Sequence, residues 1–257
     1  MLYLLFDINN NACYCISVVI QKEENMQELL RINNVSKKYG HFKALDNVSL
    51  NLQAGRIIGL LGPNGSGKTT LIKIINGLLK EYDGQIQVNG EKIGESSRKI
   101  ISYLPDENYF QDWMYVRDVL EIFSDLYSDF DSENCLSLMN RFKLDKNMKI
   151  KAMSKGMKEK FQLCLVMSRK AKIYILDEPI AGVDPAAREV ILDVILNNYE
   201  EGSLVLISTH LISDLETIFD EVIFLKEGKV VLHKETEELR IERKQSIDEA
   251  FREVFRC

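Results

Sequence analysis

The feature that most constrains the fold is a glycine-rich segment that lies between an apolar run and a helix-like pattern. Residues 62–69 read GPNGSGKT and fit the spacing G-x-x-x-x-G-K-[ST]. Arg56 to Leu61 precedes it as an apolar run typical of a strand buried on both faces, and Thr69 to Leu79 follows with helical spacing. Glycines let successive backbone N–H groups converge on phosphates, and the helix N-terminus adds its positive dipole end. The segment therefore predicts a nucleoside triphosphate site.

The glycine-rich segment supplies two side chains with specific expected roles. We expect Lys68 to pair with the β and γ phosphates and Thr69 to bind Mg²⁺ through its hydroxyl. A glycine-rich turn that merely caps a helix is the plainer alternative, and the strand before and the helix after it argue against that. The other residues expected to bind the nucleoside triphosphate are Gly62, Pro63, Asn64, Gly65, Ser66, Gly67 and Thr70.

Two acids follow a second buried run, Lys172 to Leu176. Asp177 is placed to hold the magnesium shell beside the phosphate loop. Glu178, which should point the other way along the pleat, is expected to orient and deprotonate the attacking water. A strand that ends in two solvated acids would explain this pair alone, but Lys68 and Thr69 favour the catalytic interpretation.

The order of apolar patterns predicts an α/β fold. Strands alternating with helices indicate a P-loop NTPase core with a mostly parallel sheet. The β-rich opening from Leu29 predicts an antiparallel β subdomain, and residues of about 107–170 predict an α-helical insertion. All four prolines fall at or just after predicted strand ends, the edge at which such sheets bind ligands.

The two ends of the chain are expected to lie outside the main domain at 26–234. Residues 1–25 have three open interpretations: an extension that is poorly ordered or forms an edge strand, an untranslated stretch before a start at Met26, or a membrane anchor. Lys22 to Glu24 can be encoded by a purine-rich ribosome-binding sequence, which favours the second. Residues 235–257 predict an amphipathic helical tail. Its expected apolar side comprises Ile241, Ile247, Ala250, Phe251, Val254 and Phe255.

Composition excludes several classes of function. With 33 Lys+Arg against 39 Asp+Glu, the net charge of -6 argues against a nucleic-acid partner. The five cysteines are scattered, and no Cys or His lies at zinc spacing. No apolar run has the roughly 20 residues that a membrane-spanning helix needs.

Together these residues resemble the nucleotide-binding subunit of ABC transporters over about Leu29 to His233. The resemblance implies that Tyr39 stacks on adenine and that His210 is the switch histidine that contacts the γ-phosphate. Asp184 falls in the family's D-loop, which couples two sites. The signature motif falls at Ser154, Lys155 and Gly156, and in the family it faces the ATP of a second ATPase subunit in a head-to-tail dimer. That second subunit is either an identical or a different chain.

Two motifs depart from the family's pattern. The glutamine of the family's Q-loop is here Asp106, a carboxylate that can still reach magnesium or its water. The signature has Lys155 and Met157 where the family usually has glycine and glutamine, and Lys155 adds a positive charge near the expected phosphate. Every residue needed for hydrolysis is present, so we expect an active ATP hydrolase that uses ATP and Mg²⁺.

The resemblance also implies partners and a location. ATP hydrolysis would drive a transmembrane permease subunit. Binding to that subunit would place the chain in the cytoplasm on the inner face of the membrane. Asn108 to Met114 falls where the family receives a helix of that permease, and packing under the helical insertion is the alternative. The short tail favours an exporter. Two other functions stay open: an assembly or mechanotransmission ATPase that acts on a protein partner, and a nucleotide-gated module without turnover.

Overall fold

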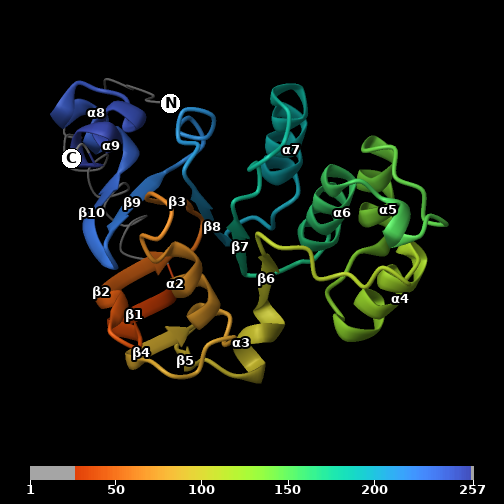
Figure 1. Cartoon of the computed structure of the whole chain (residues 1–257), viewed down its shortest axis with the longest axis horizontal. Helices are drawn as coiled ribbons and strands as arrows, with labels where there is room; N and C mark the ends of the chain where they lie inside the picture. The colour runs from red at the N-terminus through yellow and green to blue at the C-terminus, as the bar shows by residue number, and fades with distance from the viewer. Residues whose placement is uncertain (1–26, 256–257) are drawn as a thin grey trace, which may run out of the picture.

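A six-stranded sheet built from the apolar runs lies at the centre of the molecule (Figure 1). The computed structural model describes residues 27–255, so the interpretations of residues 1–25 fall outside it. The strand order is β10-β9-β3-β8-β7-β6; only β10 pairs antiparallel. The middle strands are buried along their whole length, as expected for strands covered on both faces. The strands are β3 (Ile57–Leu61), β6 (Ile101–Leu104), β7 (Ile173–Asp177), β8 (Leu204–Thr209), β9 (Glu221–Lys226) and β10 (Lys229–Glu235).

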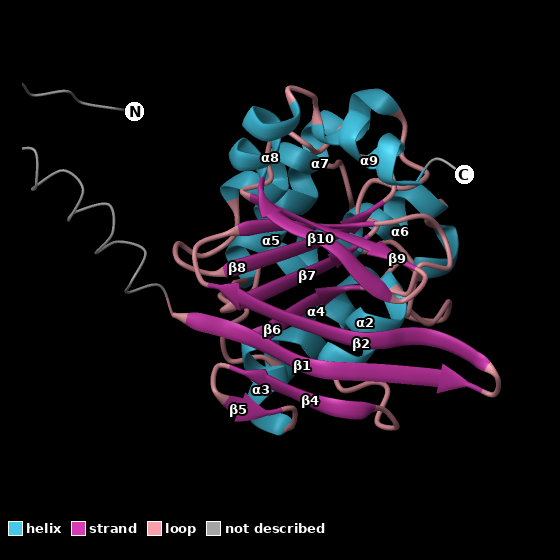
Figure 2. Cartoon of the chain, turned by 90° about the vertical axis from the view of Figure 1, so that its left-hand side faces the viewer, coloured by secondary structure: helices cyan, strands magenta, loops and turns pink. Residues whose placement is uncertain are grey.

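A second, antiparallel sheet packs against the helix that follows the phosphate loop (Figure 2). Its order is β2-β1-β4-β5, and alternating apolar residues of β1 and β2 join a buried cluster with Ile72 and Ile75. This packing fixes the strand hairpin at one side of the phosphate loop. The elements are β1 (Glu28–Tyr39), β2 (Phe42–Gln53), β4 (Asp83–Val88), β5 (Glu91–Lys92) and α2 (Lys68–Ile75).

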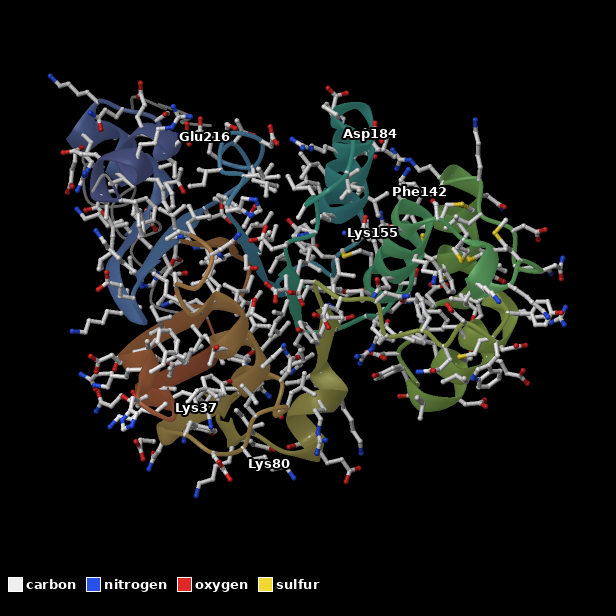
Figure 3. The ribbon with its side chains drawn as sticks, viewed as in Figure 1. Lys37, Lys80, Phe142, Lys155, Asp184 and Glu216 are labelled. Atoms are coloured by element: carbon white, nitrogen blue, oxygen red, sulfur yellow. The ribbon has the colours of Figure 1, made fainter. Side chains whose placement is uncertain are left out.

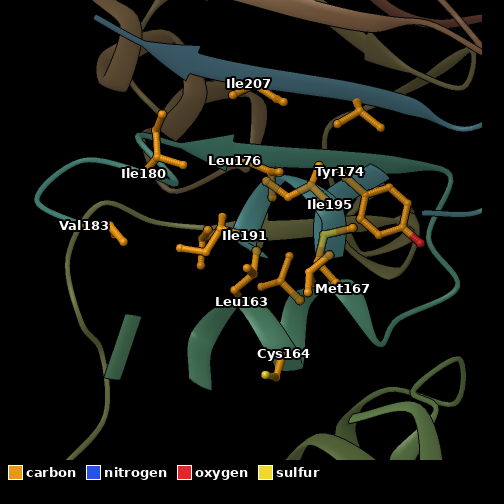
Figure 4. Packing of buried hydrophobic residues seen from close by; sticks show 14 of the residues in the cluster. Leu163, Cys164, Met167, Tyr174, Leu176, Ile180, Val183, Ile191, Ile195 and Ile207 are labelled. Atoms are coloured by element: carbon orange, nitrogen blue, oxygen red, sulfur yellow. The ribbon is translucent and has the colours of Figure 1, made fainter. Parts of the chain in front are cut away.

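The helical insertion lies at the far side of the central sheet from the tail (Figure 1). Asp131 caps α5 by accepting a hydrogen bond from Asn134 N–H, and Ser154 caps α6 in the same way from Met157 N–H. The face of the central sheet that is turned away from α2 packs on α6 and α7 through residues such as Leu163, Leu176 and Ile191 (Figure 4). The helices are α4 (Val116–Leu126), α5 (Ser132–Arg141), the 3-10 turn η1 (Ile150–Ala152), α6 (Lys155–Met167) and α7 (Pro185–Asn197).

Two short segments flank strands of the central sheet. Residues 95–100 form a short helix, α3 (Glu95–Ile100), just before β6, and residues 213–218 after β8 are a run of turns. No helix within residues 27–255 is long and apolar enough to cross a membrane.

The tail forms two helices, α8 (Thr236–Arg243) and α9 (Ile247–Phe255), that pack on the central sheet. Phe251 and Phe255 stack on each other and contact Phe224 of β9. Ile241 was placed wrongly on the apolar side, because the chain turns between the helices and leaves that side chain 75% exposed. Leu239 is the hydrophobic residue of α8 that is buried instead.

Candidate functional site

The phosphate loop joins the end of β3 to the start of α2, and two of its glycines are required by close packing. A Cβ on Gly62 would lie 2.5 Å from both Ser66 Oγ and the Leu225 carbonyl. Gly67 has a φ of 110°, and a Cβ there would lie 2.5 Å from the Ala44 carbonyl. The loop backbone is therefore held tightly against β2 and β9. The loop residues from Asn64 to Thr70 line one small pocket.

Lys68, the first residue of α2, folds back over this loop. Its side chain is nearly buried, and Nζ donates to the Gly62 carbonyl at 2.7 Å and to the Pro63 carbonyl at 3.4 Å. Glu178 Oε1 lies 3.7 Å from Nζ. Burial lowers the pKa of Lys68, and the charges of Glu178 and Asp177 partly oppose this. The ammonium group is thus surrounded by two neutral carbonyls and one carboxylate, and phosphate oxygens can replace the carbonyls.

Asp177 is the last residue of β7 and is only 1% exposed. Ser208 of β8 donates its hydroxyl to Asp177 Oδ1, whereas Oδ2 finds no hydrogen-bond partner among residues 27–255. Burial raises the pKa of Asp177; the Ser208 and Thr69 hydroxyls oppose the shift, and the charges of Asp106 and Glu178 add to it. A buried, unpartnered carboxylate oxygen close to Thr69 fits a divalent cation.

The cation would need more ligands than these carboxylates provide. Within the described part of the chain, no group of three or more His, Cys, Asp and Glu side chains is arranged to hold a metal ion. Thr69 and the nucleotide's own phosphate oxygens would have to complete the shell, as usual for Mg²⁺ bound with phosphates. The residues present fit a metal that arrives with its nucleotide.

Glu178 leaves the strand in a left-handed conformation, with a φ of 53°. The expectation that pleat alternation sets its direction was therefore wrong, because the turn that begins here sets it instead. Its N–H donates to the Ser208 carbonyl at 3.0 Å, and Oε2 lies 2.9 Å from His210 Nδ1. The strand ends of β7 and β8 thus place the two side chains in contact.

The β1–β2 hairpin adds aromatic side chains beside the phosphate loop. Tyr39 and Phe42 face each other across the turn, are 47% and 60% exposed, and line the pocket with Ala44. Sequence reasoning singled out Tyr39 and missed Phe42. The signal was present, because a tight turn at residues 40–41 makes 39 and 42 cross-strand partners.

Asp106 lies where the phosphate loop meets the acids. It lines the pocket that Lys68, Thr69 and Glu178 share, and also an adjoining pocket with Asp177. A single chain therefore brings together the phosphate loop, Asp106, Asp177, Glu178 and His210.

The signature residues lie elsewhere, at the start of α6 (Figure 3). Ser154 Oγ accepts from Met157 N–H at 3.2 Å. The side chain of Lys155 is 85% exposed, with Glu159 Oε1 at 3.7 Å, and a Cβ on Gly156 would meet open space. Lys155 lines the pocket of Asp106, Asp177 and Glu178, but Ser154 and Gly156 do not line the phosphate-loop pocket.

Asp184 lies at the surface and caps α7. Its Oδ1 accepts from Ala187 N–H at 3.1 Å, and Pro185 follows as the first helical residue. The D-loop residues before it turn back from Glu178, with Ala181 N–H donating to the Glu178 carbonyl at 3.1 Å. The loop is thus continuous with the acid pair.

Asn108 to Met114 divides between the two interpretations offered for it. Phe110 and Met114 are buried, as packing would require, whereas Trp113 is 72% exposed. Asn108 and Tyr109 line a groove of about 630 Å³ between the central sheet and α4.

Comparisons with known proteins agree on one family. The family model of the ABC transporter matches residues 45–181. An uncharacterized ABC transporter ATP-binding protein of Methanocaldococcus jannaschii is 35% identical over 219 residues, which is 83% of this chain and 80% of that protein. A lantibiotic transport ATP-binding protein of Streptococcus pyogenes is 31% identical over 80% of this chain and 91% of that protein. The solved structure of an ATP-binding subunit of an ABC transporter superposes with a TM-score of 0.80 at 26% identity, over 88% of this chain and 99% of that one.

Proposed function

The chain belongs to the ABC transporter ATP-binding family, an ATPase family, and from that premise we propose that it drives export through a separate transmembrane permease. The convergence of Lys68, Asp177, Glu178 and His210 at the strand ends beside the phosphate loop supports the ATP-hydrolysing part of the proposal. The similarity to a lantibiotic transport ATP-binding protein supports the direction of export. Each residue is proposed to serve one part of hydrolysis.

Glu178 and His210 are proposed to act on the attacking water. His210 Nδ1 lies against one oxygen of the Glu178 carboxylate, which leaves the other facing Lys68 and the loop. A carboxylate held in this way orients a water and accepts its proton. Lys68 and the loop N–H groups stabilise the phosphate charge, and bound Mg²⁺ would add charge neutralisation. Asp106, Asp177 and Thr69 are the residues proposed to hold that ion.

A second copy of this chain is proposed to complete each site in a head-to-tail dimer. The chain has an intact phosphate-loop half and, on a different element, an exposed signature half at Ser154 to Gly156. Two identical chains can therefore form two complete sites. The exposed Lys155 and the N-terminus of α6 would then face the ATP bound by the opposite chain.

The permease is proposed to dock in the groove beside α4. Four exposed apolar side chains lie in its lining: Leu78, Tyr109, Ile122 and Leu126, with exposures of 60%, 43%, 42% and 69%. Such a surface fits a short amphipathic helix. Docking there would hold the chain at the inner face of the membrane.

The test is substitution of Leu126→Asp in the native complex. We expect the permease to be lost from a gentle detergent pull-down while ATP binding is retained. Ile241→Asp is the matched control, because that side chain is 75% exposed and lies on the tail. A permease that still co-purifies with Leu126→Asp would contradict the docking site.

The direction of transport is tested in membrane vesicles that contain the native complex. Inside-out vesicles that take up substrate with ATP added outside would support export. Right-side-out uptake dependent on ATP inside would contradict it. An assembly ATPase is the alternative, and wild-type protein that co-purifies with water-soluble partners while retaining turnover would favour it.

A further inference from the structure

The stretch after His210, residues 211–219, forms contacts that the proposed hydrolysis does not use. We call it the switch segment. Ile212 and Leu215 are buried, and the ring of Phe219 packs against Gly59 of β3, where a Cβ would approach it to 2.8 Å. The segment is therefore pressed against the strand that leads into the phosphate loop.

The tail fixes one side of the switch segment. Arg240 of α8 donates Nη2–H to the Glu216 carbonyl at 2.9 Å, and Glu216 Oε2 accepts from Asp248 N–H at the start of α9, at 3.0 Å. Figure 3 shows Glu216 close to these helices. Because Ile247 and Ala250 of α9 are fully buried, this side has a well-packed anchor.

Arg188 of α7 holds the other side of the segment, and the same guanidinium also holds the D-loop. Its Nη1 donates to Asp214 Oδ2 at 2.6 Å, and its Nε donates to the Val183 carbonyl at 3.0 Å. Val183 is the residue before Asp184 and is itself largely buried against the core (Figure 4). A planar guanidinium can make both bonds at once, which a lysine ammonium on a flexible stem does far less well.

These contacts close a ring around the proposed catalytic pair. The turn that begins at Glu178 leads to Val183. Arg188 links Val183 to Asp214, and His210 lies four residues before Asp214 in the chain. His210 Nδ1 returns to Glu178 Oε2. A displacement of the D-loop therefore reaches the Glu178–His210 pair by two routes, one through the turn and one through Arg188.

We propose that Arg188 is a positioning residue that ties the D-loop to the switch segment. Contact of the exposed D-loop with a second subunit then sets the geometry of the Glu178–His210 pair. This inference rests on the proposed dimeric ATPase. It predicts that Arg188 affects turnover and leaves nucleotide binding by the single chain unchanged, since Arg188 touches neither the phosphate loop nor the hairpin aromatics.

Two variants separate this role from a merely structural ion pair. Arg188→Lys keeps the positive charge opposite Asp214 and removes the forked bond to Val183. The charge swap of Arg188→Asp with Asp214→Arg restores an ion pair but leaves the Val183 carbonyl without a donor. Arg141→Lys is the matched control. Arg141 of α5 pairs with Asp193 of α7, the helix that also carries Arg188, but this pair lies on the side of the helical insertion and away from the switch segment.

We measure thermal unfolding, the Kd for Mg-ATP and kcat. Both variants should bind Mg-ATP within about twofold of wild type while kcat falls about tenfold, the usual range of a coupling effect. Arg141→Lys should match wild type in all three. Wild-type kcat in Arg188→Lys, or kcat restored by the swap, would overturn the proposal. Where the swap does not fold, Arg188→Lys decides alone.

The two proposals fail separately in this design. Arg188→Lys that matches a hydrolysing wild type contradicts the D-loop link and leaves the permease proposal intact. A permease that stays bound to Leu126→Asp contradicts docking and leaves the link intact.

Discussion

Two lysines occupy the same position in two helices and have opposite surroundings. Lys68 is the first residue of α2 and Lys155 the first residue of α6. The side chain of Lys68 is 6% exposed, with two carbonyls and a carboxylate around it, whereas that of Lys155 is 85% exposed, with a single carboxylate at 3.7 Å. The helix N-terminus alone therefore does not make a binding site.

The difference shows what each half of the molecule contributes. Around Lys68 the fold has already removed water and supplied the polar groups that a phosphate can replace, so the site is organised before nucleotide arrives. The ammonium group of Lys155 is exposed to water, because the fold places it at the start of α6 without burying it. A second chain would bury this group. The predictions below test this division, from the largest effect to the smallest.

Glu178→Gln should separate binding from turnover most strongly. The substitution keeps the size and the contact with His210 but removes the proposed proton acceptor, so we expect kcat to fall by about 10² to 10⁴-fold. Binding of Mg-ATP should be retained. Turnover within tenfold of wild type would show that another group acts on the water. Steady-state phosphate release and equilibrium binding of labelled ATP measure the two properties.

Lys68→Ala and Lys155→Ala should affect single-chain binding differently. Loss of the enclosed ammonium removes charge-assisted bonds worth about 1.5–3 kcal/mol each, so Kd for Mg-ATP should rise about 10- to 100-fold or more. Lys155→Ala should leave Kd unchanged when measured at protein concentrations too low for dimers. An equal rise in Kd for Mg-ATP in both variants would contradict the division of the site into a phosphate-loop half and a signature half.

Asp177→Asn should stabilise the nucleotide-free protein. Burial raises the pKa of Asp177, so the folded chain keeps the proton to a higher pH than the unfolded chain. Stability of the wild type therefore falls as pH rises from the unfolded pKa through the raised folded value. The variant should lack this loss and gain about 1–3 kcal/mol at neutral pH.

Chemical unfolding at several pH values measures the effect of Asp177→Asn. Asp193→Asn is the control, since that side chain is 49% exposed and should shift the unfolding free energy by less than about 0.5 kcal/mol. An unfolding free energy for Asp177→Asn below that of wild type at neutral pH would contradict the assignment of a buried carboxylate with one unpartnered oxygen.

Phe42→Ala should give the smallest effect. If both hairpin aromatics contact the base, removing Phe42 should cost about 1 kcal/mol in ATP binding, roughly fivefold in Kd. Kd for inorganic triphosphate, which lacks the base, is the internal control and should not change. An unchanged Kd for ATP would leave Tyr39 as the aromatic that contacts the base.

Local sequence patterns predicted much of the fold. The GPNGSGKT segment, the buried runs of β3 and β7 and the acids after them were readable because each depends on neighbours in the chain. The overall α/β class followed from the alternation of strands and helices. The errors came where tertiary contacts set the outcome. Ile241 has the spacing of an apolar face, but a turn between α8 and α9 directs it to solvent.

For the candidate site, the sequence could predict only those residues that belong to a motif. No pattern in the sequence shows that Ser208 contacts Asp177 or that Arg188 bridges Val183 and Asp214, because these pairs are joined by the order of strands and the packing of α7. The direction of Glu178 was also missed, since a left-handed residue after a strand does not follow the pleat. The sequence could therefore name candidate residues where a motif keeps them adjacent in the chain, whereas the contacts between them are visible only in the structure.

The central claim, that two chains each contribute half of a site, is tested most directly by mixing two inactive variants. Lys68→Ala disables the phosphate-loop half. Gly156→Glu disables the signature half by repulsion, and the open space around Gly156 lets the fold accept it. In a mixed dimer, one site combines an intact phosphate loop with an intact signature. We predict that ATP hydrolysis reappears on mixing, and a mixture as inactive as either variant alone would contradict the account.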